Sequence, residues 1–388
     1  MLLSGTLIGK PFLASVDICG THKNKKNSAY VVHGYLVPEG YMAYIFDSSY
    51  PIEYIKNLSQ YFPQASILYD VSMTEELCDY DIISVNANGN IQIVYQDASS
   101  DNVLFITNKC NSNCIMCPDS IAHRKRDLGR RKEYLERIIE LIPSDTPHIT
   151  ITGGEPTLLK WDFIEILSRC KEKFTQTHFL MLSNGRTLSN DAYREAFVES
   201  LPNYFRLAVP IYGCDYLNHD LITRAEGSFE QTMYALGHLQ KQLELEIRIV
   251  IMRNNYRNLP QMAKFFVENL PYTYTVSFMG MELLGNAAVN REELWIDYET
   301  TIPYVAEAIK MLLSSGIDAR IYNYPLCKVP ANLWPITVKS ITDYKIRYKD
   351  ECSFCSQRDL CGGFFFSTLH LEDIPVYPII EGQTNEKE

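Results

Sequence analysis

From about residue 101 onward, apolar strand-like segments alternate with helical segments, and this alternation constrains the fold more than any other feature. The strand-like segments end at Thr107, Thr152, Ser183, Ile211, Met252 and Met279. The helical patterns cover approximately 131–142, 160–173, 190–200, 228–243, 259–269 and 299–314. Such alternation predicts βαβ units and a parallel sheet. Six units within about 220 residues favour an α/β fold with a partial (β/α)6 TIM-like barrel, although periodicity alone also allows a doubly wound sheet.

The segments on either side of this alternation have a different character. Residues 1–100 contain short β-branched and aromatic runs separated by Pro, Gly and Asn turns, which predicts an N-terminal β-rich accessory domain. Within it we expect a hairpin around residues 86–90 and a helix near residues 52–61. Residues 101–317 are the predicted barrel. Residues 318–388 are the predicted C-terminal cysteine-rich extension, which begins with one further strand.

Composition narrows the class of protein. A chain of 388 residues with 46% hydrophobic residues is large enough for two or three domains. Its net charge of −11 argues against a partner held through nucleic-acid phosphates. We expect no membrane span and no signal peptide, because no long apolar run and no basic N-terminal region is present. Eleven cysteines without an export signal indicate metal ligands and buried thiols in a cytoplasmic protein.

Three cysteines follow the first strand of the alternation with C-x3-C-x2-C spacing: Cys110, Cys114 and Cys117. Thiolates are the ligands of iron–sulfur clusters, and a [4Fe–4S] cube takes four of them. Three ligands would leave one iron open, which suggests chemistry rather than electron storage. The alternatives are three incidental thiols or a zinc knuckle, for which His123 is the nearest fourth ligand.

The second strand ends in Gly153-Gly154-Glu155-Pro156. The two glycines let the backbone approach a ligand closely, and the glutamate presents a carboxylate beside it. Taken alone, this tetrapeptide is an ordinary βα turn. Its position one βα unit after the cysteine loop gives it weight, because both lie at carboxyl ends of strands, where barrels carry their chemistry.

These two motifs, in this order, resemble the radical SAM superfamily over about residues 103–280. The resemblance implies that the three cysteines bind a [4Fe–4S] cluster and that S-adenosylmethionine chelates its open iron. It also implies that Gly153, Gly154 and Glu155 line the methionine amino group. In this superfamily one electron from the cluster cleaves the sulfonium, and the resulting 5′-deoxyadenosyl radical abstracts a hydrogen from the substrate. One departure is Met116, where the superfamily often has an aromatic residue near the adenine.

Three more residues are candidates for contacts to S-adenosylmethionine. Ser183 and Asn184 follow the third strand in a sequence similar to the superfamily's Thr-Asn-Gly, and a plain turn is the alternative. Arg248 is a charged residue within an apolar strand. A buried arginine needs a carboxylate partner, so it binds either the S-adenosylmethionine carboxylate or a structural glutamate or aspartate.

A second cysteine set lies near the C-terminus: Cys327, Cys352, Cys355 and Cys361. Four cysteines hold zinc or a [4Fe–4S] cluster equally well. Because the chain already has a cluster-type loop, we favour a fully ligated auxiliary [4Fe–4S] cluster over zinc. The remaining cysteines have no partner at ligand spacing and are expected to be structural: Cys19, Cys78, Cys170 and Cys214.

The two end segments resemble one branch of the superfamily, the His-Xaa-Ser system radical SAM maturases. DIISVNANGNIQIVYQ precedes the cysteine loop, and the chain closes with YNYPLCK and ECSFCSQRDLCGGFF. This branch implies post-translational modification of a ribosomally made precursor peptide or protein that carries His-Xaa-Ser repeats. It also implies a second radical SAM partner protein, and we expect an external electron donor.

Two other functions remain open. A radical SAM enzyme acting on another peptide, a small molecule or a tRNA would share the same barrel, and the acidic chain counts against tRNA. A non-catalytic iron–sulfur or zinc protein, serving as a redox carrier or scaffold, would share the cysteines. The Gly153-Gly154-Glu155 turn argues against this scaffold, since an electron carrier needs no nucleoside site.

Overall fold

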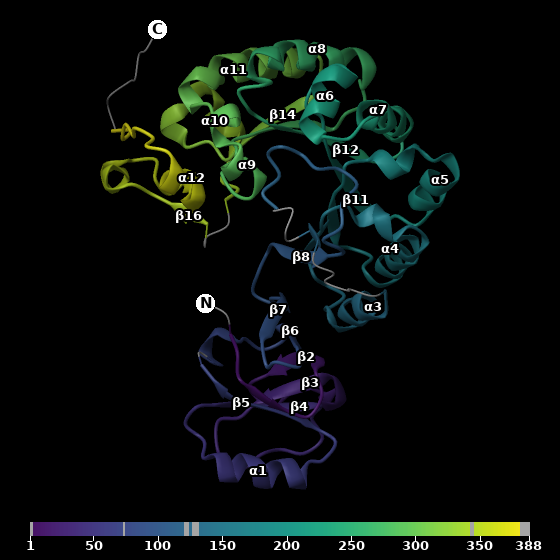
Figure 1. Ribbon diagram of the computed structural model, residues 1–388, viewed down its shortest axis with the longest axis vertical. Coiled ribbons are helices and arrows are strands. Elements are labelled where there is room, and N and C mark those ends of the chain that lie inside the picture. The colour runs from purple at the N-terminus through teal and green to yellow at the C-terminus, as the bar shows by residue number, and fades with distance from the viewer. Residues whose placement is uncertain (1–2, 73, 120–123, 126–131, 342–344, 381–388) are drawn as a thin grey trace.

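The structure, a computed structural model, describes residues 3–72, 74–119, 124–125, 132–341 and 345–380. A small N-terminal sheet lies below a large curved sheet whose outer face is covered by helices (Figure 1). None of the described helices combines the length and the apolar character needed to cross a bilayer.

The large sheet consists of eight parallel strands arranged in chain order. They are β8 (Asn102–Phe105), β9 (His148–Thr152), β10 (His178–Leu182), β11 (Tyr204–Pro210), β12 (Glu244–Val250), β13 (Thr275–Met279), β14 (Asp318–Tyr322) and β15 (Thr337–Val338). β8 and β15 are its two edges, so the sheet curls into a half-barrel without closing.

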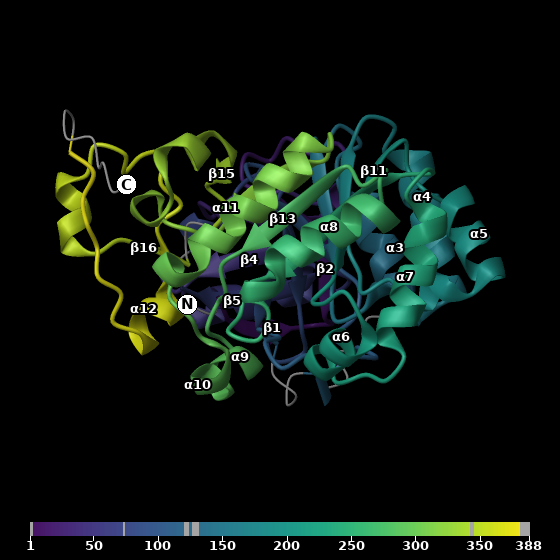
Figure 2. The ribbon, with the colours of Figure 1, turned by 90° about the horizontal axis from the view of Figure 1, so that it is seen from above.

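The outer helices follow the strands in sequence, as seen from above in Figure 2. They are α3 (Lys132–Leu141), α4 (Trp161–Lys173), α5 (Asp191–Glu199), α7 (Ser228–Leu239), α8 (Leu259–Asn269) and α11 (Tyr298–Ser314). Three short helices, α6 (Tyr216–Thr223), α9 (Asn286–Val289) and α10 (Arg291–Leu294), lie in the connections after β11 and β13. Short 3-10 helices follow three of the strands: η3 (Pro156–Leu159), η4 (Arg186–Ser189) and η5 (Tyr256–Asn258).

The alternation of side chains along each strand separates an apolar outer face from a polar inner one. On β12, Leu245, Ile247 and Ile249 belong to the core beneath the helices. Because successive side chains of a strand point to opposite faces, Glu246 and Arg248 lie on the concave face. The half-barrel interior therefore carries charged side chains close to the carboxyl ends of the strands.

The N-terminal sheet is mixed, with the order β1-β5-β4-β3-β2-β6-β7. Its strands are β1 (Thr6–Ile8), β2 (Phe12–Asp17), β3 (Ser28–Val31), β4 (Ala43–Asp47), β5 (Ser66–Val71), β6 (Ile82–Val85) and β7 (Ile91–Tyr95), with 3-10 helices η1 (Lys25–Asn27) and η2 (Thr74–Glu76). Helix α1 (Ile52–Tyr61) and the antiparallel β6–β7 hairpin lie where the sequence predicts them.

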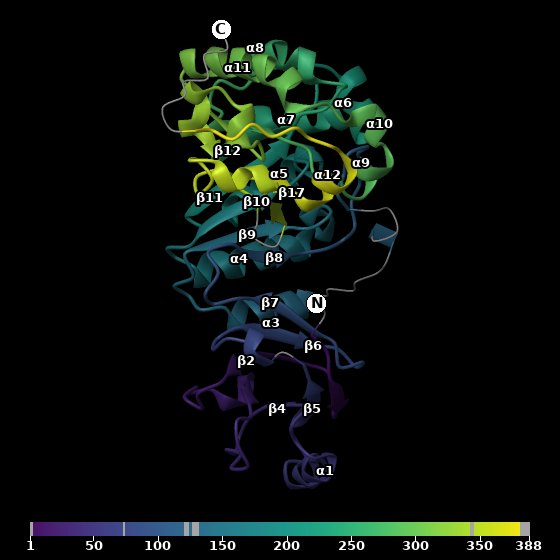
Figure 3. The same ribbon diagram turned by 90° about the vertical axis from the view of Figure 1, so that its left-hand side faces the viewer.

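The N-terminal sheet packs directly against the start of the barrel, near β8 and α3 (Figure 3). The hydroxyl of Tyr95 lies 3.0 Å from that of Thr146, and Arg137 Nη2 donates to Asn27 Oδ1 at 2.5 Å. Ile82 and Tyr95 are part of the barrel core. These two residues join the N-terminal sheet to the barrel core, while the rest of that sheet is packed around two hydrophobic clusters of its own.

After β14 the chain forms short elements beside the half-barrel. They are η6 (Leu326–Lys328), η7 (Ala331–Ile336), η8 (Asp350–Phe354), α12 (Phe366–Leu371) and a small antiparallel pair of β16 (Ile346–Arg347) with β17 (Phe364–Phe365). This segment bears the second cysteine set.

The predicted α/β fold with an open TIM-like barrel is confirmed, and each predicted strand and helix of the barrel contains an observed one. The large sheet has two strands more than the (β/α)6 arrangement, because β14 and β15 continue it beyond residue 317. The sequence analysis also missed α6, whose eight residues are too few for a clear helical period.

Candidate functional site

The cysteine loop lies at the carboxyl end of β8 and is supported from below by α6. The amide of Asn113 donates to the carbonyl of Thr223 at 2.8 Å, and that of Ile115 donates to the carbonyl of Ile222 at 2.9 Å. Backbone hydrogen bonds of this kind fix the path of the loop without using its side chains. The three cysteine side chains thus remain available as ligands.

The Gly153-Gly154 turn packs against the residues that precede Cys110. A Cβ atom at Gly153 would lie 2.3 Å from the carbonyl oxygen of Thr107, and one at Gly154 would lie 2.4 Å from that of Lys109. Gly154 N donates to Thr107 O at 2.6 Å, and Glu155 N donates to Lys109 O at 2.8 Å. The glycines therefore permit a close approach to the chain's own cysteine loop.

The Glu155 side chain is completely buried and joins two strand ends. Its Oε1 accepts from the amide and hydroxyl of Thr157, at 3.1 and 2.6 Å, and from the hydroxyl of Ser183 at 2.9 Å. Its Oε2 accepts from the amide of Asn184 at 2.7 Å. Burial raises the pKa of Glu155, and these four hydrogen bonds act against that rise. Oε1 thus accepts from three donors and Oε2 from one, and because a carboxylate oxygen has two lone-pair positions, two of the donors to Oε1 share one of them.

Ser183 and Asn184 are thereby drawn toward the cysteine loop. The Asn184 side chain donates from Nδ2 to Asn111 Oδ1 at 2.6 Å and lies 4.0 Å from Cys110 Sγ. The Ser183 hydroxyl accepts from the amide of Gly185 at 3.0 Å while donating to Glu155. Both residues lie at the site where the sequence predicts them, and they brace its walls; a contact to S-adenosylmethionine stays a prediction.

A segment 170 residues away in sequence clamps the other side of the cysteine loop. Asn286 donates from its amide to Cys117 O at 2.9 Å and from Nδ2 to Cys114 O at 2.9 Å. Asn290 Nδ2 donates to Ile115 O at 2.8 Å. Gly285 has φ +57°, and a Cβ there would lie 2.2 Å from the carbonyl oxygen of Pro118. Sequence analysis missed these residues, although a Gly-Asn pair after a barrel strand was a visible signal.

Two arginines hold the open end of the loop. Arg124 donates to Ser112 O and to Asn113 Oδ1, both at 2.8 Å. Arg186 donates from Nη1 to Asn111 O and from Nε to Gln231 Oε1 at 2.8 Å. The sequence analysis did not identify either residue. His123, the predicted fourth ligand of a zinc knuckle, lies outside the described residues.

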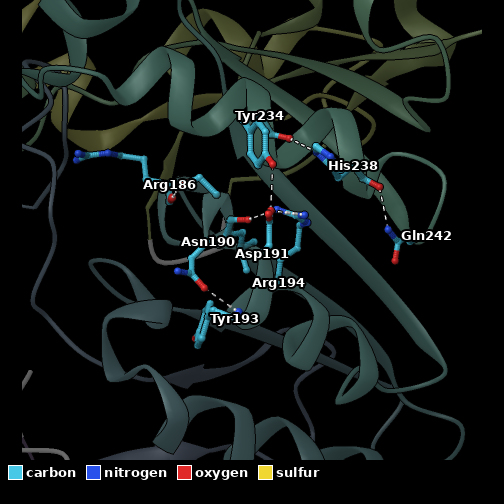
Figure 4. A network of polar contacts seen from close by, with 10 residues as sticks. Arg186, Asn190, Asp191, Tyr193, Arg194, Tyr234, His238 and Gln242 are labelled. Atoms are coloured by element: carbon cyan, nitrogen blue, oxygen red, sulfur yellow. Dashed lines mark hydrogen bonds and ion pairs between the residues drawn. The ribbon is translucent and has the colours of Figure 1, made fainter.

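A polar network beside Arg186 joins η4, α5 and α7 (Figure 4). Asp191 Oδ1 accepts from Arg194 Nη2 at 2.7 Å and from the Tyr234 hydroxyl at 3.1 Å. Hydrogen bonds to a carboxylate are stronger than neutral ones. The network therefore fixes α5 against α7, the helix whose Gln231 orients the Arg186 guanidinium.

The three thiols belong to partly buried residues. Burial raises the pKa of Cys110 and of Cys117, and it raises the pKa of the Cys114 thiol to about 12. Binding a metal as thiolates must therefore release protons. Met116 lies next to them in a buried cluster with Tyr212 and Met252, so it forms part of the apolar wall of the site.

The spacing of the sulfur atoms bears on which metal would fit. The ligand atoms of a single tetrahedral zinc lie about 3.8 Å apart, as Zn–S bonds of about 2.3 Å require. Neither cysteine set belongs to the one group of described residues whose ligand atoms all lie within 4.8 Å of one another. A cube binds each thiolate to a different iron, so its ligand atoms lie further apart than those of a single zinc ion.

Arg248 has a structural carboxylate partner, which is one of the two alternatives that the sequence allows. Its Nε donates to Glu246 Oε1 at 2.8 Å, and the same oxygen accepts from the hydroxyl of Ser277 at 2.8 Å. Glu246 is buried, whereas the guanidinium is partly exposed on the concave face. Whether Arg248 also binds the S-adenosylmethionine carboxylate stays a prediction.

The four C-terminal cysteines, Cys327, Cys352, Cys355 and Cys361, line one cavity. Two backbone amides point at a single sulfur: Leu326 N and Gly363 N lie 3.3 and 3.4 Å from Cys361 Sγ. Burial raises the pKa of Cys327 to about 11 and also raises that of Cys352. The fold thus brings together four thiols separated by up to 34 residues.

The chain is similar to several known proteins. Residues 104–266 match the radical SAM superfamily. The chain is 25% identical over 162 residues to an AdoMet-dependent heme synthase of Nitratidesulfovibrio vulgaris, which covers 41% of this chain and 42% of that protein. It is 22% identical over 285 residues to the uncharacterized protein MJ0907 of Methanocaldococcus jannaschii, covering 72% of this chain and 85% of that protein. The solved structure of anSMEcpe with bound AdoMet shares 18% identity at a TM-score of 0.45 and covers 57% and 63% of the two chains.

The matches cover only part of this chain. The chain spans less than half of the heme synthase. The superfamily match ends at residue 266, before the segment that bears Gly285 and before the C-terminal cysteines. The part that matches the superfamily therefore contains the cysteine loop and the Gly-Gly turn.

Proposed function

We propose that the protein cleaves S-adenosylmethionine and modifies a ribosomally made peptide or protein. The starting point is the match of residues 104–266 to the radical SAM superfamily. One observation carries the proposal. The three thiols of the C-x3-C-x2-C loop lie at the carboxyl edge of the half-barrel, backed by a Gly-Gly turn that touches the same loop. Barrels of this class carry their chemistry at that edge.

The chain's own residues have two tasks in this function. Cys110, Cys114 and Cys117 would hold a [4Fe–4S] cluster. The clamp of Gly285 and Asn286 on one side, and the backbone amides of Gly154 and Glu155 on the other, keep their loop in one conformation. When bound, this cluster supplies one-electron cleavage of the sulfonium of S-adenosylmethionine, which yields a radical that removes hydrogen from the substrate. The apolar wall around Met116 and Tyr212 excludes water from this reaction.

An auxiliary [4Fe–4S] cluster at the C-terminal cysteines is the second part of the proposal. Two features support it over zinc: the four sulfur atoms are not gathered within single-ion distance, and backbone amides donate to Cys361 Sγ. Amide hydrogen bonds to sulfur are a known means of setting cluster potentials. The role assigned to this cluster is electron relay between an external donor and the substrate radical.

The substrate class rests on the resemblance of the end segments to the His-Xaa-Ser maturases, and the polar concave face supports a polar substrate. Glu246 and Arg248 on β12 offer charged groups there. A polypeptide with His and Ser side chains suits such a surface. A second radical SAM protein would then act alongside this one on the same precursor.

The first experiment measures iron and nucleoside. After anaerobic reconstitution we expect about eight irons per chain, as two cubes require. Addition of dithionite and S-adenosylmethionine should release 5′-deoxyadenosine. Cys114→Ala should abolish the nucleoside and keep about four irons, whereas Cys214→Ser, a cysteine outside both sets, should change neither quantity.

The second experiment addresses the substrate. The protein is co-expressed with a precursor that carries His-Xaa-Ser repeats, and the precursor is examined by mass spectrometry against a Cys114→Ala control. A mass change that needs Cys114 supports the proposal. Nucleoside formation without any change in the precursor would reject the peptide assignment but keep the radical SAM activity, and an iron porphyrin is then the next substrate to test, because one relative is a heme synthase.

A further inference from the structure

We propose that the amino end of the half-barrel binds the polypeptide substrate, at the end of the strands opposite the cysteine loop. This surface presupposes the peptide substrate of the proposed function. Two neighbouring cavities of about 830 and 560 Å³ lie there and share Leu243 and Glu244. The first residues of five strands line them: His148, His178, Tyr204, Glu244 and Asp318. The two cavities together form what we call the amino-end groove.

Three half-exposed tyrosines line the amino-end groove. Tyr204, Tyr272 and Tyr274 are 44%, 56% and 48% exposed. The Arg206 Cζ atom lies 4.3 Å from the centroid of the Tyr274 ring, and the His178 ring stacks on that of Tyr204 at 4.8 Å. Tyrosine and arginine are enriched at surfaces that bind polypeptides, because each combines a flat face with polar groups. Exposed aromatic rings beside a cavity therefore indicate a binding surface.

Two carboxylates in the groove each have one oxygen without a hydrogen-bond partner. Glu244 Oε2 accepts from Nε and Nη2 of Arg206, at 3.1 and 2.9 Å. Asp318 Oδ2 accepts from Arg320 Nε at 2.8 Å and from the Thr275 hydroxyl at 3.3 Å. Within the described part of the chain, no hydrogen bond reaches Glu244 Oε1 or Asp318 Oδ1. Since an arginine holds each carboxylate in place, the second oxygens are fixed acceptors for a ligand.

These acceptors suit a polypeptide that is rich in histidine and serine. Imidazole N–H and hydroxyl groups are donors, and an imidazole stacks on tyrosine as His178 does on Tyr204. Strand β13 separates Glu244 on β12 from Asp318 on β14, so these two strands lie about 10 Å apart. A three-residue repeat in an extended chain also spans about 10 Å, so successive histidines of His-Xaa-Ser repeats would reach both carboxylates. The same two carboxylates disfavour a nucleic acid, because they repel its phosphates.

The groove also lies within reach of the cysteine loop along β10. Leu180 lines the groove, and it lies on the concave face because its neighbours Phe179 and Met181 belong to the core beneath the helices. Asn184, whose Nδ2 is 4.0 Å from Cys110 Sγ, follows four residues later. At about 3.3 Å per residue the separation is about 13 Å. A peptide anchored in the groove therefore presents a residue about four positions away to the cysteine loop, and the groove positions the substrate without taking part in the chemistry.

The test measures binding of a labelled peptide to the cluster-loaded, full-length protein by fluorescence anisotropy. The peptide carries two His-Xaa-Ser repeats, and a second peptide has alanine in place of each histidine and serine. Glu244→Gln and Asp318→Asn put an amide nitrogen where the free oxygen is now, because the arginine keeps the remaining oxygen. Each variant should raise the Kd of the repeat peptide about tenfold, and the alanine peptide should bind the wild type about tenfold more weakly. Glu268→Gln, an exposed carboxylate paired with Lys264 on α8, is the matched control and should leave the Kd unchanged.

The groove is overturned by any of four results: no binding of the repeat peptide to the wild type, an unchanged Kd in both variants, equal binding of the alanine peptide, or binding of a single-stranded RNA in preference to the peptide. If a variant folds poorly, hydrogen exchange of the wild type provides the readout. The repeat peptide should protect the amides of residues 241–244 and 272–275, and protection confined to other segments refutes the proposal.

The groove and the proposed function fail in different ways. A repeat peptide that binds the groove but shows no mass change rejects peptide modification and keeps the groove. A precursor that is modified with the same KM by the wild type and by both variants rejects the groove and keeps the function.

Discussion

Replacing Glu155 with glutamine distinguishes a carboxylate that holds the site together from one that contacts a ligand. Glutamine keeps one acceptor oxygen, which in its best orientation serves the three donors from Thr157 and Ser183. Its amide group then faces the backbone N–H of Asn184, where the carboxylate now accepts at 2.7 Å. One charge-assisted hydrogen bond becomes a contact between two donors in a fully buried position.

The expected cost follows from that single lost bond. A hydrogen bond to a charged group contributes about 1.5–3 kcal/mol, and removing its acceptor leaves the Asn184 amide unsatisfied. Burial disfavours the charged form of Glu155, as its raised pKa shows, so a neutral glutamine avoids this desolvation penalty and offsets part of the lost hydrogen-bond energy. We therefore expect the loss to be about 1.5–2 kcal/mol, which corresponds to roughly 10–30-fold faster local opening.

Hydrogen exchange followed by mass spectrometry measures this opening directly. In Glu155→Gln the amides of Thr157 and Asn184 should exchange faster by that factor, while those of β12 stay unchanged. Ser183→Ala removes one of three donors from Oε1 and should give a smaller effect, about 1 kcal/mol. Unchanged exchange combined with a raised KM for S-adenosylmethionine would refute this reasoning and would indicate that the carboxylate contacts the ammonium, as the sequence analysis predicts.

Three further predictions test other contacts. Gly285→Ala should displace the cysteine loop, because the new Cβ meets Pro118 O at 2.2 Å, and iron analysis should show loss of the first cluster only. Burial lowers the pKa of His219 from 6.5 to about 4. The neutral ring therefore contributes its full stability above pH 6.5, and this contribution is lost as the pH falls from 6.5 to 4, so the free energy of unfolding from thermal melts should decrease by roughly 3 kcal/mol over this interval. His219→Asn should flatten this pH dependence. Glu246→Gln removes the partner of Arg248 and should lower the free energy of unfolding in urea by about 2 kcal/mol; an unchanged midpoint would contradict the importance of this pair.

His219 also illustrates how burial changes the interpretation of a residue. The Asn218-His219-Asp220 stretch follows the fourth strand, in a part of the chain for which the sequence predicts no helix. The structure places His219 in α6, where Nδ1 accepts from the amide of Tyr212 at 3.3 Å. It therefore supports the wall of the site and is shielded from a substrate.

The sequence by itself determined the α/β alternation, the strand ends and the two cysteine sets. These features depend on hydrophobic period and on ligand spacing, which are local properties of the chain. The Gly-Gly-Glu turn was recognised as part of the site for the same reason. Its glycines were expected to admit a ligand, and only the structure showed that Gly153 and Gly154 accommodate Thr107 and Lys109.

Tertiary structure alone decided which groups satisfy one another across long stretches of chain. The clamp of Asn286 on Cys114, the pairing of Arg248 with Glu246 and Ser277, and the proximity of Asp79 to Asp17 and His22 have no local signature. Each depends on how strands and loops pack, because a buried polar group takes whichever partner the fold brings within hydrogen-bond distance. The sequence therefore determined the candidate ligands of the site, and packing determined which residues hold them in place.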